Sequence, residues 1–289
     1  MLLQVIFSGI VVGCLYALAG MGLVIIFKVS EIVNFSQGDM TTMVMFVAST
    51  LLVGLGFHYA WVLLILVPFA MSFALILERG IVRHLYRKPA LDIIIATLGI
   101  GLVINGICGW VWGYNIRSLP TIVSGSAIEF GNLYFAKNDL LIVAIAAFLM
   151  IGFFLFFEKS HFGMIMRATC INPESARLMG VNVGIVYSIS WGIAGLLSAI
   201  AGILISPITY LDVHSIDSFM IKAFAALVLG GFTSLFGVVV GGLVLGVSSN
   251  LLAAYISTEL KSTYIFLLML VILVIRPSGL FGEISRKRV

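Results

Sequence analysis

Charged side chains are scarce in this sequence. Asp, Glu, Lys and Arg make up only 10% of the 289 residues, whereas hydrophobic residues make up 62%. A soluble core of this size cannot hide so many apolar side chains, and long runs with few charges are typical of transmembrane helices. Long alternating strands of the outer-membrane barrel kind are missing, so the spans are predicted to be helical. We therefore expect an all-α, polytopic integral membrane protein.

The motifs of several enzyme classes are also missing. The chain has no G-x-x-x-x-G-K-[ST] segment, which excludes a Walker A loop and ATP hydrolysis by this chain, and it has neither H-E-x-x-H nor G-x-S-x-G. Its three cysteines, Cys14, Cys108 and Cys170, lie too far apart for metal-ligand or redox spacing. We expect neither an enzyme nor a metal site, and no cofactor bound by this chain.

Acidic residues within the apolar runs are missing too. Four carboxylates fall near predicted span ends: Glu31, Asp39, Glu78 and Asp92. Transporters coupled to protons or sodium usually keep ionisable groups inside their spans, where these groups carry the coupling ion. This pattern argues against secondary active transport, so energy must come from another source or the pathway is passive.

The apolar runs set the number of spans. They lie at about 5–27, 39–56, 60–78, 92–112, 139–157, 186–206, 223–256 and 263–275. The run 223–256 is too long for one helix across about 30 Å of hydrocarbon, and "GGFTSLFG" at 230–237 is predicted to break it. We expect about eight or nine transmembrane or half-membrane helices in a single transmembrane domain, 1–289.

Basic residues indicate the orientation. Most of them fall into three clusters on one predicted side: Arg79, Arg83, Arg87 and Lys88; Lys159, Arg167 and Arg177; and Arg276, Arg286, Lys287 and Arg288. The positive-inside rule then places the C-terminus and residues 158–185 in the cytoplasm and the N-terminus outside. The net charge of +4 follows this membrane pattern and does not suggest nucleic acid as a partner. The first run lacks the basic start and cleavage site of a signal peptide and is predicted to be a retained span.

A faint internal repeat connects the two halves of the chain. "ALAGMGLVII" (17–26) resembles "AIAGILISPI" (199–208), and each is followed by a polar stretch and then an apolar helix. On the predicted topology these two later helices run in opposite directions, as in the inverted repeats of transporters. Chance similarity between apolar helices is an equal alternative.

Two polar stretches could line a transport pathway. In "KVSEIVNFSQGDM", Asn34, Ser36 and Gln37 bring hydrogen-bonding groups to the joint between two helices, and the functional interpretation is a broken helix beside the pathway. Helix capping by Asn34 or Ser36 explains the same residues equally well.

The second polar stretch lies in "ATLGIGLVINGICGW". Thr97, Gly101 and Asn105 recur every four residues and therefore share one helix face. This face could line a pore. It could also be a small-residue packing seam with one hydrogen-bonded asparagine, which we favour slightly.

The segment "CINPESARLMGVN" at 170–182 is predicted to form a short, separate cytoplasmic helix. Asn172 is suited to cap it, Pro173 to occupy its first position and Gly180 to end it. Ala176, Leu178 and Met179 would give it an apolar face. An ordinary surface helix in a loop is the alternative, but the two caps and the exposed apolar residues favour a docking element.

These residues resemble a known family, the permeases of ABC importers for branched-chain amino acids. "INPESARLMGVN" is similar to the coupling-helix loop with its Glu-Ala-Ala…Gly pattern, although Ser175 replaces an alanine. "GLVIIFKVSEIVNFSQGDM", "AFAALVLGGFTSLFGVVVGGLVLG" and "RPSGLFG" resemble other segments of the family in the same order, although the family often has histidine in place of Gln37. The resemblance implies the fold of an ABC type II-like importer permease with a coupling-helix loop at about 159–185.

The resemblance also implies partners and roles. The implied partners are a second homologous permease in a heterodimer, two cytoplasmic ATP-binding subunits that use ATP and Mg²⁺, and a periplasmic substrate-binding protein. The residues implied in ATPase coupling are Asn172, Pro173, Glu174, Ser175, Ala176, Arg177, Leu178, Met179 and Gly180. The candidate pathway residues are Asn34, Ser36, Gln37, Thr97 and Asn105.

Branched-chain amino acids are the substrates that we expect to cross the bacterial inner membrane through this chain. An apolar path with a few hydrogen-bonding groups suits an aliphatic zwitterion, but it does not exclude urea or a short amide. A passive channel for a small neutral solute and a purely structural membrane subunit are two further alternatives.

Overall fold

The structure is a computed structural model that describes residues 2–86, 88–123, 127–130 and 133–282. Its elements, in order, are α1 (Leu2–Ser30), α2 (Gln37–Ser49), the π-helix η1 (Thr50–Gly54), α3 (Tyr59–Gly80), the 3₁₀-helix η2 (Val82–Leu85), α4 (Ala90–Trp112), β1 (Ile128–Phe130), β2 (Leu133–Phe135), α5 (Lys137–Lys159), α6 (His161–Ile171), α7 (Pro173–Leu178), α8 (Val183–Ile205), α9 (Ser215–Gly230), α10 (Leu235–Tyr255) and α11 (Lys261–Ile275). The two short strands form an antiparallel hairpin, and the prediction of an all-α protein is confirmed.

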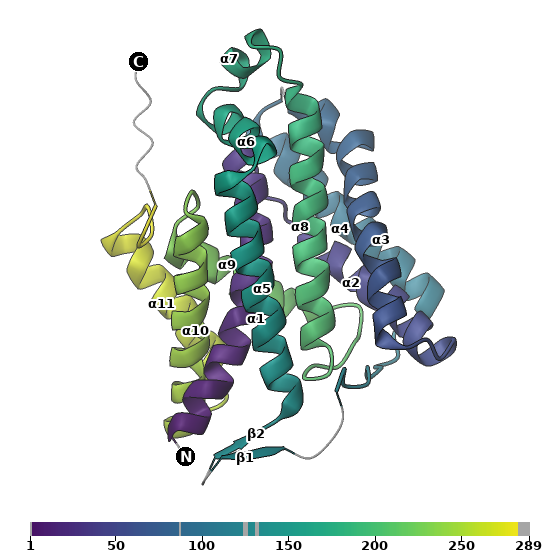
Figure 1. Cartoon of the computed structure of the whole chain (residues 1–289), viewed down its shortest axis with the longest axis vertical. Coiled ribbons are helices and arrows are strands. Elements are labelled where there is room, and N and C mark those ends of the chain that lie inside the picture. Colours follow the sequence, from purple (N-terminus) through teal and green to yellow (C-terminus); the bar gives the residue numbers. More distant parts are fainter. Residues whose placement is uncertain (1, 87, 124–126, 131–132, 283–289) are drawn as a thin grey trace.

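Six helices in the described part of the chain are long and apolar enough to cross a membrane: α1, α3 with η2, α4, α5, α8 and α10. Three shorter helices, α2, α9 and α11, complete the bundle (Figure 1). The predicted break in the run 223–256 is confirmed, because α9 ends at Gly230 and α10 begins at Leu235. There the side chain of Ser234 caps α10 by accepting a hydrogen bond from the backbone nitrogen of Gly237.

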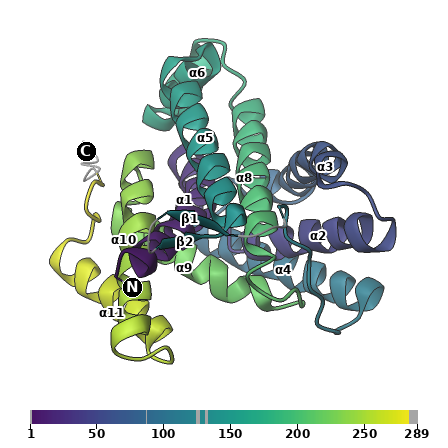
Figure 2. The ribbon, with the colours of Figure 1, turned by 60° about the horizontal axis from the view of Figure 1, so that its bottom comes forward.

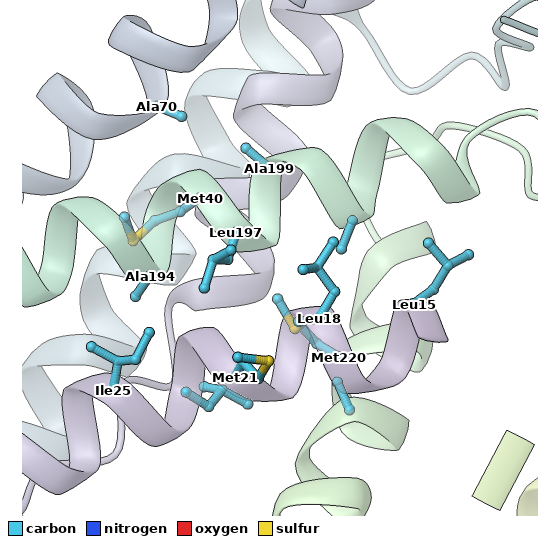
Figure 3. Close-up of a cluster of buried hydrophobic side chains, with 14 of the residues drawn as sticks. Leu15, Leu18, Met21, Ile25, Met40, Ala70, Ala194, Leu197, Ala199 and Met220 are labelled. Carbon is cyan, nitrogen blue, oxygen red and sulfur yellow. The ribbon is translucent and has the colours of Figure 1, made fainter. Parts of the chain in front are cut away.

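The helix α1 lies at the centre of the bundle and is buried along most of its length. It contacts α10, α8, α9 and α5, and its Leu18 and Met21 share a cluster with Leu197 of α8 and Met220 of α9 (Figure 3). The outer helices α4 and α5 instead expose large apolar side chains, such as Leu102 and Phe148. Such an apolar exterior suits contact with lipid or a partner helix.

Small residues allow α1 and α10 to approach closely. A Cβ atom added at Gly246 would lie 2.4 Å from the backbone Cα atom of Gly13, and one added at Gly9 would lie 2.7 Å from that of Val247. Neither backbone can move aside without separating the helices. Glycine at these positions therefore sets the distance between α1 and α10.

Polar connections lie at the two ends of the bundle. The hairpin of β1 and β2 lies at the same end as the start of α1, whereas α6 and α7 lie at the opposite end (Figures 1 and 2). This arrangement places the predicted coupling helix and the N-terminal end of α1 on opposite sides.

The short helices α2 and α9, which follow the two repeated segments in the sequence, run in opposite directions. Along α9, Phe219 contacts Tyr16 and Ala223 approaches Gly20, so α9 runs beside α1 in the same direction. The helix α2 instead runs in the same direction as α8, because Gln37 bonds to Ala194 and Thr41 approaches Gly202. The helix α8 runs opposite to α1 (Figure 1). These opposite directions are those that the predicted inverted repeat requires.

The packing predicts that Gly246→Ala destabilises the protein. The added methyl group would collide with the backbone of α1, and overpacking of this kind costs about 1–3 kcal/mol. We expect a lower midpoint of thermal unfolding in detergent. Gly152→Ala on α5 is the matched control, since a Cβ atom there meets nothing within 4 Å. Equal midpoints for the two variants would contradict close packing of α1 and α10.

Candidate functional site

The short helix α7 forms as the sequence predicts. The side-chain oxygen of Asn172 accepts hydrogen bonds from the backbone nitrogens of Glu174 and Ser175, both at 3.0 Å. Pro173 occupies the first turn, and Gly180 follows the helix with a φ angle of +87°, a conformation that favours glycine. Both ends of α7 are therefore fixed by local chemistry.

The predicted single apolar face of α7 is wrong. Ala176 is buried, whereas Leu178 and Met179 are 90% and 85% exposed. The alanine thus faces the protein and anchors α7, while the two larger side chains point away from it. Leu178 and Met179 thus form a small exposed apolar surface at the end of α7.

A polar network fixes α8 to α3 close to α7. The Arg83 guanidinium donates to the Glu78 carboxylate at 3.1 Å and to the Gly184 carbonyl at 2.9 Å, and it also contacts the Ser188 hydroxyl. That hydroxyl donates to Glu78 at 2.6 Å. Glu78 is fully buried and depends on these partners. Sequence reasoning missed this network because Ser188 lies more than a hundred residues from its partners in the chain.

The segment between α1 and α2 turns the chain back into the bundle. The Asn34 side-chain oxygen accepts from the Ser36 backbone nitrogen at 3.1 Å and from the Ser36 hydroxyl at 2.7 Å. Ser36 directly precedes α2 but forms no side-chain cap. The capping interpretation is therefore wrong in its detail, because Asn34 organises the turn and neither side chain caps the helix.

Gln37 connects the start of α2 to α8. Its amide nitrogen donates to the Ala194 carbonyl at 3.3 Å and to the Ser198 hydroxyl. Its amide oxygen is buried and has no partner among the described residues. An unpaired buried amide oxygen is unfavourable unless a ligand or water satisfies it. The Gln37 amide oxygen is thus a buried acceptor without a partner among the described residues.

Asp39 lies beside the middle of α4, and its predicted place at a span end is wrong. The Asn105 amide donates to its carboxylate at 2.8 Å, and a Cβ atom added at Gly101 would lie 2.2 Å from an Asp39 oxygen. The error arises because the apolar run suggested a full span, whereas α2 starts inside the bundle. The inference that the interior lacks acidic residues is therefore wrong, because Asp39 lies inside the bundle against α4.

The face of α4 that carries Thr97, Gly101 and Asn105 packs against α2. The Thr97 side chain is buried and donates to the Ile94 carbonyl at 2.9 Å. The contacts of Asn105 and Gly101 with Asp39 fit the packing-seam alternative.

A cavity of about 140 Å³ lies between α1, the turn before α2 and α9. Its lining residues are Leu23, Val33, Asn34, Phe35, Gln37, Gly38, Met220, Ile221 and Phe224. Of the five candidate pathway residues, Asn34 and Gln37 border this cavity, Ser36 is buried beside them, and Thr97 and Asn105 are not among its lining residues. The structure thus separates the candidates into two sets.

Known proteins that are similar to this chain include membrane permeases. The family model described as "Branched-chain amino acid transport system / permease component" matches residues 5–275. The chain belongs to this family. It is therefore a permease component of ABC transport rather than an enzyme, with several membrane-spanning helices.

Three relatives match over almost their whole length. The high-affinity branched-chain amino acid transport system permease proteins LivH of Salmonella typhimurium and BraD of Pseudomonas aeruginosa are 28% and 27% identical, over 97% of this chain and 96% of each relative. The probable branched-chain amino acid transport permease protein LivH of Methanocaldococcus jannaschii is 28% identical over 95% of this chain and 91% of its own length. The solved complex of PsaBC from Streptococcus pneumoniae with Fab has a TM-score of 0.49 at 14% identity, covering 92% of this chain and 90% of that chain.

Arg83→Met should destabilise the protein more than the double substitution Glu78→Gln with Arg83→Met. The single change leaves the buried Glu78 carboxylate without its cationic partner. Because the Arg83 side chain is itself 38% exposed, we expect a cost below the roughly 3 kcal/mol of a fully buried pair. The double change removes the charge as well. Thermal unfolding of the purified protein in detergent measures the difference, and equal losses would show that the ion pair is unimportant.

Proposed function

We propose that this chain is the transmembrane permease subunit of a heteromeric ABC importer for branched-chain amino acids in the bacterial inner membrane. The observation that carries the proposal is α7, which is capped at both ends and exposes Leu178 and Met179 at the tip of the bundle (Figure 1). The proposed partners are a second homologous permease, two ATP-binding subunits that use ATP and Mg²⁺, and a periplasmic binding protein.

The proposed orientation places α7 and the C-terminus in the cytoplasm and the N-terminus outside. Its support is the distribution of basic residues. Lys28 and Lys159 lie in the last turns of α1 and α5, and Lys28 and Arg167 both contact the Phe157 ring. Arg83 bonds to Gly184 at the start of α8, and Arg177 belongs to α7 itself. Cytoplasmic ends of membrane proteins carry this excess of positive charge.

The proposed coupling begins at α7. Leu178 and Met179 would enter a groove on an ATP-binding subunit, while Ala176 keeps α7 attached to the permease. Motion of α7 would reach α8 directly, because only a four-residue connection separates the two helices. The network of Arg83 and Glu78 would then move α3 together with α8.

The proposed pathway suits an aliphatic zwitterion. Asn34 and Gln37 offer a few hydrogen-bonding groups beside an otherwise apolar cavity. The names of the relatives specify branched-chain amino acids, and this substrate class is transferred to the present chain as part of the proposal. A urea or short-amide permease and a passive channel are the competing outcomes of the experiment below.

Glu174→Arg should prevent assembly with the ATP-binding subunits without preventing membrane insertion. The side chain is exposed in the first turn of α7, where an acidic residue interacts favourably with the helix dipole and a basic one does not. The chain would be co-expressed with its genomic neighbours and purified through a tag, and the copurified proteins would be identified. Gly180→Pro should have the same effect, because proline cannot adopt the positive φ angle of Gly180.

Arg79→Glu is the matched control, since it also changes the charge of an exposed residue near the α7 end but lies on α3. It should retain the ATP-binding subunits. Uptake of radiolabelled leucine, but not urea, by vesicles that contain the assembled complex would support the substrate class. Recovery of the native chain alone, as a homo-oligomer that conducts a solute without ATP, would overturn the importer in favour of a channel.

A further inference from the structure

The first two turns of α9 lie at the middle depth of the bundle. The ring centroid of Phe219 is 5.6 Å from that of Tyr16, the central residue of α1. A Cβ atom added at Gly20 would lie 3.2 Å from the Ala223 carbonyl oxygen. His214, which directly precedes α9, is only about 7.5 Å from Phe219 along the axis, at 1.5 Å per residue. All these residues therefore lie within roughly 15 Å of the centre of the membrane, half the thickness of its hydrocarbon.

One side of these turns is polar and uncovered. His214, Ser218 and Lys222 recur every four residues and therefore share a side of the helix. The His214 side chain is 71% exposed, Ser218 is exposed and Lys222 is half-buried. Ile221 lies beside them and is 46% exposed. The helix thus presents hydroxyl, imidazole and ammonium groups at the depth of the lipid tails.

Lys222 has no acidic partner in the part of the chain that the structure describes. No hydrogen bond or ion pair joins its side chain to another of these residues. Asp217, the carboxylate closest to it in sequence, instead pairs with His214 at 3.3 Å. Lys261 at the start of α11 donates to Asn250 at 2.6 Å and adds a second positive charge that interacts with Lys222. This side of the protein therefore lacks a negative charge for Lys222.

Lipid does not suit this side of α9. Ionisable side chains at membrane depth almost always face the interior of a bundle or a water-filled cavity, or pair with another group. Near their middles, α4 and α5 expose apolar side chains such as Leu102 and Phe148, which lipid tolerates. The polar side of α9 differs from them and requires a protein or aqueous neighbour.

We propose that the side of α9 that carries His214, Ser218, Ile221 and Lys222 contacts the second permease subunit, which supplies an acidic side chain to Lys222. This inference rests on the proposed function. The ATP-binding subunits and the binding protein lie outside the membrane and cannot reach the middle of the bundle. Among the proposed partners, depth therefore selects the second permease.

The contact would place the transport pathway at the boundary between the two permeases. Ile221 also borders the cavity of about 140 Å³ beside the start of α2. Phe35, another residue of that cavity, is 43% exposed. The cavity is therefore open next to the polar side of α9, and the second permease would cover the opening.

Lys222→Glu tests the charge pairing. A second negative charge would repel the acidic side chain of the partner, so the amount of second permease that copurifies with the tagged chain should fall by about tenfold or more. Lys222→Arg keeps the charge and is the matched control, with native recovery expected. The ATP-binding subunits should remain bound to the Lys222→Glu chain through α7, which shows that it is folded. Native recovery of the second permease by Lys222→Glu would overturn the pairing.

Photo-crosslinking tests the contact without a change of charge. The chain would be co-expressed with its genomic neighbours and carry Ile221→p-benzoylphenylalanine, and the products formed in ultraviolet light would be identified by mass spectrometry. We expect the second permease as the main product. Leu102→p-benzoylphenylalanine is the matched control, because Leu102 is 74% exposed near the middle of α4. It should give about tenfold less of this product or none.

The failure of this interface and the failure of the importer are distinguishable. Products from position 221 that contain only lipid or a second copy of this chain would overturn the interface, as would equal yields of the second permease from both positions. The importer would survive these results. Absence of a second permease from the native complex would instead overturn the proposed function.

Discussion

The requirement that buried polar groups find partners controls the centre of this protein. The helix α2 begins inside the bundle, where water cannot reach every free amide. Asn34 organises the turn that leads to it, and Gln37 connects its first turn to α8. The position of Asp39 against α4 and the cavity beside α9 both follow from where α2 starts. A continuous helix through residues 31–36 would remove both features.

At the α7 end, the buried polar group that needs partners is a charged side chain. There Glu78 is buried, and Arg83 and Ser188 together neutralise and hydrogen-bond it. The result is a polar contact between α3 and α8 close to the helix that we propose to receive motion from the ATP-binding subunits. Apolar packing alone would allow these helices to slide, whereas hydrogen bonds with fixed directions hold them in register.

Local patterns were predictable from the sequence. The capping of α7 by Asn172, its end at Gly180 and the break after Gly230 depend on a few neighbouring residues, and each was confirmed. Contacts between distant segments were not predictable in this way. Asp39 was misplaced because hydropathy measures composition and not where a helix begins in space, and the network around Glu78 joins residues that no local pattern connects.

The glycine contacts between α1 and α10 have a consequence for biosynthesis. The face of α1 that carries Gly9 and Gly13 meets its partner glycines, Gly242 and Gly246, only after more than two hundred further residues have been synthesised. The first helix to leave the ribosome therefore obtains its closest neighbour late. Until then, lipid or the insertion machinery must cover this face, and contacts of such long sequence separation form slowly. The centre of the finished bundle is thus among the last parts of the protein to be completed.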